Sequence, residues 1–196
     1  DICNYFNVKN LFLKHSFDRI IHCAAESHVT RSEINPDVFY ETNVKGTEIL
    51  IEDVKKSQKQ ILFLHVSTDE IYGSSNNASF RESDKIAGTQ QATSDYAKSK
   101  SLADDIAAEY SEELPIIIVR PTNNFGSHQF PEKALPRWVC RALQSRTIPV
   151  WGKGYQVRDW LYVQDACEAF LHLLDHGKAG EAYNLAANNS PEIKNI

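Results

Sequence analysis

A phenol and an ammonium group lie four residues apart in the chain, at Tyr96 and Lys100. On a helix this spacing is about one turn, so both side chains can face one ligand. A free phenol, with a pKa of about 10, is a poor base at neutral pH. We expect the lysine and the positive ring of a bound redox cofactor to lower that pKa, and the lysine to hold the cofactor ribose. The alternative is a solvated helix on which the two residues share no task.

Three adjacent side chains that can handle protons, Thr68, Asp69 and Glu70, follow the apolar run Ile61–Val66. Consecutive acids are poor core residues, so they must lie in a loop or cleft. Carboxyl groups that share a site repel each other, which raises one pKa and lets one group act as acid while the other acts as base. The alternative is a cluster that only caps a short helix.

Other polar residues are weaker candidates. Ala24 and Ala25 precede Glu26–His28, and small residues at a strand end let a cofactor approach the backbone. His28 has either a direct role or a structural one. Lys133 and Arg158 can bind a diphosphate, or they are ordinary surface charges.

The elements that position these groups alternate between short apolar runs and amphipathic segments, as in βα units on a parallel sheet. Strands are expected at Arg19–Ala24, Gln60–Ser67, Pro115–Arg120, Pro149–Gly152 and Tyr183–Ala186. Helices are expected at Phe39–Lys56, Ser94–Tyr110, Pro131–Ser145 and Val163–His176, with a polar loop over Asn123–Pro136. This order predicts an α/β fold with a doubly wound parallel sheet. Ligands bind outside the carboxyl ends of such strands, so chemistry is expected in the loops after Ala24, Val66 and Arg120.

The composition argues against several classes of protein. With 196 residues, 42% of them hydrophobic, the chain can bury a core of ordinary size. Its net charge of −5, with acids and bases interspersed, gives no basic stripe for nucleic acid. No apolar stretch approaches the roughly 20 residues that span a bilayer, and no secretory segment opens the chain. The four cysteines are scattered, so we expect reduced thiols in a cytoplasmic protein and no bound metal.

Strings along essentially the whole chain resemble the extended short-chain dehydrogenase/reductase superfamily, and within it the dTDP-glucose 4,6-dehydratase family. The strings are AAESHV (24–29), TNVKGT (42–47), HVSTDEIYG (65–73), YAKSK (96–100), NNFGSHQFPEK (123–133), VRDWLYVQD (157–165) and YNLAANN (183–189). STDE discriminates best. Related 4-epimerases have small residues where Asp69 and Glu70 stand, and GDP-mannose dehydratases typically keep only the glutamate. Thr30 stands where the family usually has Asp.

This resemblance implies a Rossmann-like fold and a hydro-lyase of deoxysugar biosynthesis that uses NAD. dTDP-glucose would be oxidised transiently at sugar C4, lose water across C5 and C6, and receive the hydride at C6. Tyr96 would take the proton of the C4 hydroxyl, with Thr68 near C4 and Lys100 on the nicotinamide ribose. Glu70 would remove the C5 proton, and Asp69 would protonate the departing C6 hydroxyl. The product would be a 4-keto-6-deoxy sugar.

The resemblance also assigns contacts and a partner. The implied cofactor contacts are Asp1, Ile2, Cys23, Ala24, Ala25, Glu26, Ser27, Thr42, Tyr96, Lys100 and Asn124. The implied substrate contacts are Ser27, Thr68, Asn123, Lys133, Pro149, Val150, Trp151, Arg158 and Asn189. Family members usually dimerise through two helices, here Phe39–Lys56 and Ser94–Tyr110, so a homodimer is expected.

One part of the family pattern does not occur in the chain. There is no Met, and the first glycine is Gly46, so the glycine-rich turn that approaches a cofactor pyrophosphate is missing. We therefore expect a piece of a longer protein, with a partial NAD-binding domain over 1–126 and part of a substrate-binding lobe over 127–196. Two alternatives stay open: another nucleotide-sugar dehydratase or decarboxylase of the superfamily, and an inactive fragment that only binds or assembles.

Overall fold

The computed structural model describes residues 1–74, 79–150 and 152–195. Its helices are α1 (Tyr5–Lys14), α2 (Val29–Ile34), α3 (Pro36–Phe39), α4 (Gly46–Lys56), α5 (Asp95–Tyr110), α6 (Ala134–Leu143) and α7 (Val163–His176). Shorter segments are the π-helix η1 (Tyr40–Lys45) and the 3-10 helices η2 (Asp69–Tyr72), η3 (Glu82–Asp84) and η4 (Ile193–Asn195). The strands are β1 (Arg19–His22), β2 (Leu62–Val66), β3 (Ile116–Pro121), β4 (Asn123–Phe125), β5 (Trp160–Tyr162) and β6 (Ala182–Leu185).

The chain forms two compact units. The first unit contains Asp1–Arg120 and Phe170–Asn184, and the second contains Pro121–Ala169 and Leu185–Ile196. Within the described residues, none of the helices combines the length and the apolar character needed to cross a membrane.

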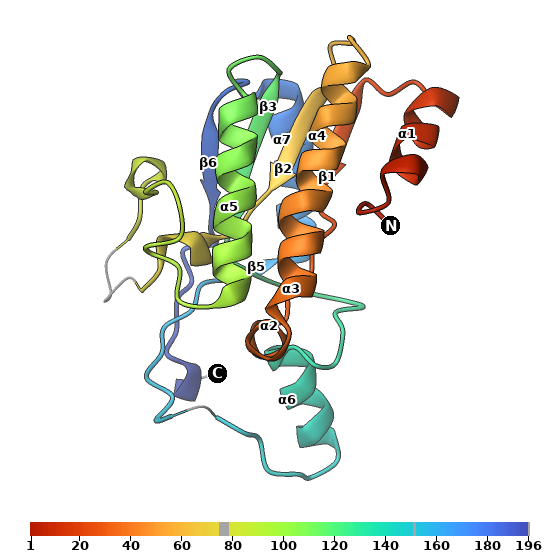
Figure 1. Ribbon diagram of the computed structural model, residues 1–196. Helices are drawn as coiled ribbons and strands as arrows, with labels where there is room; N and C mark the ends of the chain where they lie inside the picture. Colours follow the sequence, from red (N-terminus) through yellow and green to blue (C-terminus); the bar gives the residue numbers. More distant parts are fainter. Residues whose placement is uncertain (75–78, 151, 196) are drawn as a thin grey trace. The chain divides into compact units, whose positions relative to one another are not determined.

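A four-stranded sheet with the order β1-β2-β3-β6 forms the centre of the first unit (Figure 1). β1 and β2 run parallel with Ile20 opposite Phe63, and β2 and β3 run parallel with Leu64 opposite Ile117. The strand segments are rich in Ile, Leu and Val because a parallel sheet is covered on both faces. The predicted Rossmann-like parallel sheet with flanking helices is confirmed.

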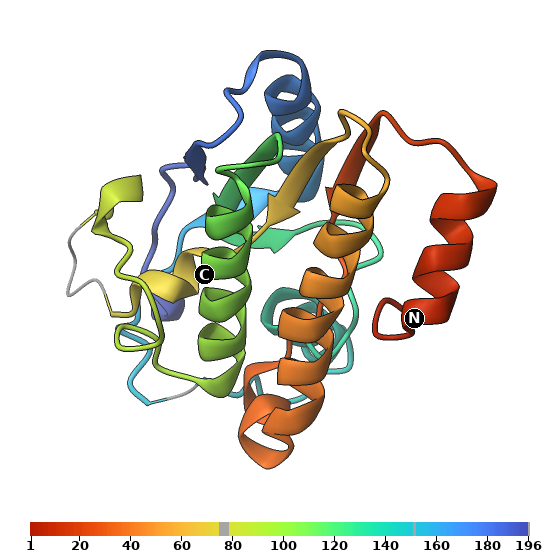
Figure 2. The same ribbon diagram turned by 45° about the horizontal axis from the view of Figure 1, so that its top comes forward.

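Helices α4 and α5 lie side by side over one face of this sheet (Figures 1 and 2). They bury a core against the strands, formed by Ile51, Val54, Ile61, Phe63, Ala107, Ile116 and Ile118. Full burial of one large apolar side chain contributes about 1.5–3 kcal/mol, so this core holds both helices on the sheet. α5 begins at a defined point because the Ser94 hydroxyl accepts a hydrogen bond from Ala97 N at 3.1 Å.

The second unit is built around a short parallel pair, β4 and β5, with Asn124 opposite Leu161. The Trp138 ring of α6 meets the Trp160 ring of β5 edge to face, with the centroids 6.4 Å apart. Such a pair adds stabilisation beyond burial, and here it packs α6 against β5.

The predicted elements agree closely with the structure. The helix at Val163–His176 is confirmed at both ends, and the strands predicted to begin at residues 19, 60, 115 and 183 are confirmed with ends displaced by one or two residues. The predicted helix at Phe39–Lys56 is present, but it begins earlier, as α3, and continues through η1 into α4. The helix predicted at Pro131–Ser145 is shorter at both ends.

Two predictions fail in the second unit. The strand predicted at Pro149–Gly152 is wrong for residues 149, 150 and 152, while Trp151 lies outside the described residues. Proline offers no N–H to a strand ladder, and Gly152 has a φ of +60°, so neither end suits a strand. The loop predicted over Asn123–Pro136 is wrong in part, because Asn123–Phe125 form β4. Their partners in β5 are distant in sequence, so local composition did not reveal the pairing.

Candidate functional site

The acids of the STDE string lie on the 3-10 helix η2, beyond the carboxyl end of β2 in the first unit. The Thr68 hydroxyl caps this helix by accepting a hydrogen bond from Glu70 N at 3.3 Å, so the capping part of the alternative is observed for Thr68. Asp69 and Glu70 are half-buried, whereas Thr68 is buried. Because the cap fixes where η2 begins, it also helps to place the two carboxylates.

Gly73 ends η2 in a conformation that only glycine adopts easily. Its φ is +79°, and a Cβ at this position would lie 2.2 Å from the Gln91 carbonyl oxygen. Both the backbone angle and the close approach exclude a side chain. The glycine of the STDEIYG string therefore allows the segment after the acids to pass against the chain that leads into α5.

Tyr96 lies in the first turn of α5, half-buried and beside the acids of η2. Burial and the charge of Glu70 raise the pKa of the Tyr96 phenol, a hydrogen bond with Thr68 lowers it, and the charge of Asp69 raises it. The net pKa lies well above the ordinary value. Burial is the largest cause of this rise, and the charge of Glu70 is the next. The lowering expected from a bound cofactor ring stays a prediction.

Lys100 lies one turn further along α5 and is buried, with 4% of its surface exposed. Its Nζ donates a hydrogen bond to the Val66 carbonyl oxygen at 2.7 Å. Burial lowers the pKa of Lys100 to about 8, although the charges of Asp104 and Cys23 act in the opposite direction. Lys100 thus reaches the carboxyl end of β2, one turn of α5 beyond Tyr96.

Two buried histidines lie close to this lysine. His22 of β1 and His65 of β2 are paired in register, with ring centroids 5.5 Å apart. Burial and the charge of Lys100 lower the pKa of His22 to about 3 and that of His65 well below its ordinary value. Both imidazoles are therefore neutral at physiological pH, and sequence reasoning gave neither of them a role.

Asn43 of η1 joins the loop after β1 to helix α5. Its amide oxygen accepts from Glu26 N at 2.8 Å, and its amide nitrogen donates to Glu26 O at 3.0 Å and to the Ser99 hydroxyl at 2.9 Å. Ser99 in turn donates to the Tyr96 carbonyl oxygen at 2.8 Å. Asn43 is fully buried and was missed from the sequence, although its place inside the TNVKGT string was a signal.

The remaining first-unit candidates lie around the same loop and at the N-terminus. Cys23, Ala24 and Ser27 are exposed, while Ala25 and Thr42 are half-buried. Asp1 accepts a hydrogen bond from Cys3 N at 2.9 Å. Ile2 lies against η1 and α4, where a Cβ at Gly46 would be 2.6 Å from its Cδ1.

In the second unit one carboxylate organises the segment that carries Asn189, one of the implied substrate contacts. Asp159 accepts hydrogen bonds from Thr122 Oγ1 at 2.7 Å, from Ala187 N and Asn189 N at 2.8 Å each, and from Ser190 Oγ at 3.2 Å. Although burial alone would raise the pKa of Asp159, these hydrogen bonds lower it below its ordinary value. Asp159 was not a candidate from sequence, although it follows Arg158, which was.

The other second-unit candidates are held loosely. Asn123 Nδ2 donates to the Asp159 carbonyl oxygen at 3.4 Å, and Asn124 Nδ2 donates to Thr122 O at 3.3 Å. Lys133 precedes the first turn of α6. Arg158 and Val150 are exposed, Pro149 is half-buried, and Trp151 lies outside the described residues. A cavity of about 270 Å³ in this unit is lined by Asn124–Gln129 and Val163.

Comparison with known proteins agrees with this geometry. Residues 1–186 match the model of the NAD dependent epimerase/dehydratase family. The chain belongs to this family. Curated relatives include a dTDP-glucose 4,6-dehydratase from Shigella flexneri, 38% identical over 216 residues, and one from Xanthomonas campestris pv. campestris, 40% identical over 200 residues. These matches cover 100% and 96% of the chain but 58% and 55% of the relatives, so the chain spans little more than half their length.

Solved structures give the same result. DesIV, a dTDP-glucose 4,6-dehydratase from Streptomyces venezuelae with NAD and TYD bound, is 36% identical with a TM-score of 0.92. The match covers 100% of the chain and 59% of DesIV. A UDP-glucose 4-epimerase from Thermotoga maritima reaches a TM-score of 0.89 at 23% identity, with 99% of the chain and 63% of that protein covered, and so shares the fold alone. Since both proteins share the fold, the fold by itself does not assign the chemistry.

Proposed function

We propose that the protein carrying this chain is an NAD-dependent dTDP-glucose 4,6-dehydratase. The observation that carries the proposal is the packing of Asp69 and Glu70 beside Tyr96, where their charges act on the phenol. An oxidation at C4 needs a tyrosine and a lysine, but elimination of water needs a further acid and base in the same place. The names of the relatives, which span the whole chain, favour dTDP-glucose as the substrate.

The first unit fits the nicotinamide end of NAD. Lys100 has three N–H donors, and its single hydrogen bond within the described part of the chain leaves two for the hydroxyls of a ribose. Ser67 Oγ at the end of β2 is buried without a hydrogen-bond partner among the described residues, so it can accept or donate there. The loop Cys23–Ser27, which is exposed at Cys23, Ala24 and Ser27, lets a planar group lie against it. Thr42 contacts the same cofactor, and Asp1 and Ile2 face its adenine in this proposal.

When bound, NAD⁺ would supply the acceptor for the C4 hydride and the source of the hydride that C6 receives. Tyr96 takes the proton of the C4 hydroxyl, while Thr68 holds the oxygen through its own hydroxyl. Because burial and the charge of Glu70 raise the pKa of the phenol, Tyr96 starts in its protonated form. It becomes a base when positive charge, from Lys100 and the cofactor ring, faces it.

The elimination uses the two acids in opposite states. Once C4 is a ketone, the C5 hydrogen is acidic and Glu70, as carboxylate, removes it. Asp69, as the neutral acid, donates a proton to the C6 hydroxyl, which leaves as water. Glu70 then returns its proton to C5 and the hydride enters C6, so the products are water and the 4-keto-6-deoxy sugar nucleotide. The proton that Tyr96 gained balances the one that Asp69 gave up. Two neighbouring carboxyl groups favour this division because they resist carrying two charges.

The second unit supplies the contacts for the nucleotide end of the substrate. Cationic Lys133 and Arg158 pair with the diphosphate, and Ser27 of the first unit with the sugar side. Neutral contacts on the substrate are Asn123, Pro149, Val150, Trp151 and Asn189, while Asn124 is on the cofactor side. This division keeps residues 1–126 as the main cofactor part and residues 127–196 as the main substrate part.

The assembly and location follow from the same proposal. Cys3, Cys23, Cys140 and Cys167 are all free thiols, which is consistent with a cytoplasmic enzyme. A homodimer forms through α4 and α5, the two helices that lie side by side. Nucleic acid and membranes are not partners in this proposal.

Substrate turnover tests the proposal. The protein is incubated with NAD⁺ and one of dTDP-, UDP- or GDP-glucose at a time. The masses of the products are then measured by mass spectrometry. We expect loss of one water from dTDP-glucose, with one solvent deuterium incorporated at C5 when the reaction runs in D₂O. A preference for another nucleotide would assign a different dehydratase, and inversion of configuration at C4, without loss of water or uptake of deuterium, would assign an epimerase.

A further inference from the structure

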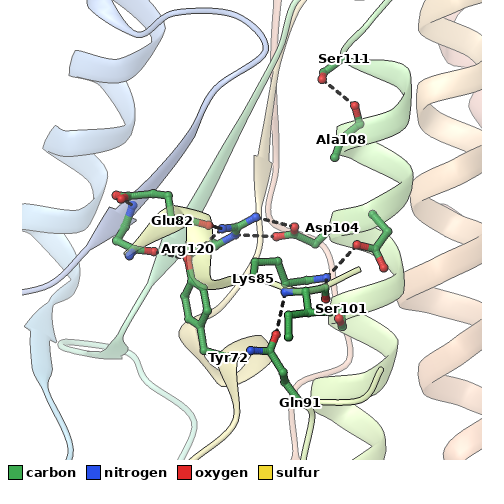
Figure 3. A network of polar contacts seen from close by, with 12 residues as sticks. Tyr72, Glu82, Lys85, Gln91, Ser101, Asp104, Ala108, Ser111 and Arg120 are labelled. Carbon is green, nitrogen blue, oxygen red and sulfur yellow. Dashed lines mark hydrogen bonds and ion pairs between the residues drawn. The ribbon is translucent and has the colours of Figure 1, made fainter. Parts of the chain in front are cut away.

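A buried guanidinium links η2, the helix of the two acids, to α5, the helix of Tyr96 and Lys100. Arg120, at the end of β3, donates from Nε and Nη2 to the two carboxylate oxygens of Asp104, at 3.0 and 2.8 Å. Its Nη1 donates to the Tyr72 hydroxyl at 2.8 Å and to the Glu82 carbonyl oxygen at 3.0 Å (Figure 3). The side chains of Arg120 and Asp104 are 5% and 1% exposed, so this ion pair is shielded from solvent.

Tyr72 extends the network on its other side. Since its hydroxyl accepts from Arg120, its own proton is free to be donated to Asn184 Oδ1, at 2.7 Å. The ring of Tyr72 also stacks on Phe80, with centroids 5.0 Å apart and planes 15° apart. Asn184 makes two further hydrogen bonds in this network. Its Nδ2 donates to Phe80 O at 3.0 Å, and its backbone N donates to Glu82 Oε1 at 2.8 Å.

The places of these residues in their elements give the network its meaning. Asp104 follows Tyr96 and Lys100 at intervals of four residues on α5, so one face of the helix presents all three. Tyr72 ends η2, the short helix that begins with Asp69 and Glu70. Arg120 therefore links α5, which carries Tyr96 and Lys100, to η2, which carries the two acids.

The ion pair between Arg120 and Asp104 is better suited to fixing the positions of side chains than to adding stability to the fold. Burying an ion pair contributes little net stability, and apolar residues of similar volume often do as well. A guanidinium held by two oxygens of a carboxylate, however, has a fixed plane, and its remaining N–H fixes a third group. The network is suited to hold η2 in one orientation against α5.

We propose that Arg120 and Tyr72 are positioning residues for the elimination step, which hold the acids of η2 at a set distance from the tyrosine and lysine of α5. This inference rests on the proposed dehydratase function. Misplacement of Asp69 and Glu70 slows the removal of water, whereas Tyr96 and Lys100 stay on an intact α5 and still support the oxidation of C4 by NAD⁺. The variant enzymes accumulate the oxidised sugar together with reduced cofactor.

The test uses Tyr72→Phe, which removes one hydroxyl and keeps the ring stack. We expect kcat for dTDP-glucose to fall by about tenfold or more, with KM within about twofold, because small misplacements of catalytic groups are costly. The steady-state absorbance of bound NADH should rise at the same time. The matched control is Tyr110→Phe at the far end of α5, which also loses a phenol hydrogen bond, to Glu52, and should behave as wild type.

Several outcomes would overturn the inference. One is a Tyr72→Phe enzyme with kcat within about twofold of wild type, and another is a slower enzyme whose bound NADH does not rise. A second variant, Asn184→Leu, removes the acceptor of the Tyr72 proton and should give the same rise in NADH. It keeps the test informative if Tyr72→Phe folds poorly. A thermal melt of Asn184→Leu shows whether this variant is folded. An inactive wild-type protein would instead refute the proposed function, so the two failures are distinguishable.

Discussion

The two units of the molecule hold their candidate residues in different ways. In the first unit Thr68 and Lys100 are buried, and the acids beside Tyr96 sit on a capped 3-10 helix packed against α5. In the second unit Arg158, Val150 and Asn189 are exposed, and the segment that carries Asn189 is tied to a single carboxylate, Asp159.

This difference teaches which property each unit controls. Burial shifts proton affinities, so the first unit sets the pKa values of Tyr96, Lys100 and the two histidines. Exposed loops keep charged side chains solvated and able to change position, which suits them to binding a nucleotide. Changes in the first unit should therefore act on rate and on pH dependence, and changes in the second on substrate affinity.

The largest effect is expected from Tyr96→Phe. Loss of the phenol removes the proton acceptor for the C4 hydroxyl, so kcat should fall by about 10²–10⁴-fold. KM should change little because the substrate is gripped elsewhere. Steady-state kinetics with dTDP-glucose measure both values, and bound NADH should stay undetectable. A Tyr96→Phe enzyme with near wild-type kcat would contradict the assignment of chemistry to the first unit.

A smaller effect concerns the pH dependence of stability. The pKa of His65 is lowered well below its ordinary value, so below about pH 6.5 the unfolded chain binds a proton that the folded chain does not. Stability therefore falls as the pH falls. His65→Leu removes one such site, and its loss of unfolding free energy between pH 7 and pH 5 should be smaller by about 2 kcal/mol.

Urea unfolding at the two pH values measures this difference. The matched control is His128→Asn in the second unit, where the histidine is exposed and Asn tolerates the φ of +66°. The control should keep the acid sensitivity of the wild type. An equal change in both variants would mean that the two units do not differ in this respect.

The smallest effect is expected from Asp159→Asn in the second unit. The amide is a weaker acceptor for the backbone N–H groups of Ala187 and Asn189, so the nucleotide-end segment loosens. KM for dTDP-glucose should rise by about tenfold while kcat changes less than about threefold. Asp165→Asn, at an exposed acid in the same unit, is the control and should leave both unchanged. A fall in kcat alone would erase the proposed division between the units.

Much of the first unit could be predicted from sequence. Apolar runs such as Ile61–Val66 and the Ser94 cap are local signals, because burial and capping depend on nearby residues. The acids at 69 and 70 and the Tyr96–Lys100 spacing were also visible, since side-chain type and helical period suffice. The second unit was less predictable because β4 exists only through its pairing with β5.

By itself the sequence determined which chemical groups are available and which short elements carry them. Only the tertiary structure decided how these groups act on one another. It buried Tyr96 beside Glu70, and this burial, together with the charge of Glu70, raises the pKa of the phenol. It also joined Asp104 and Tyr72 through Arg120. Burial and charge act through space, and residues that are distant along the chain become neighbours only when the sheet and its helices pack together.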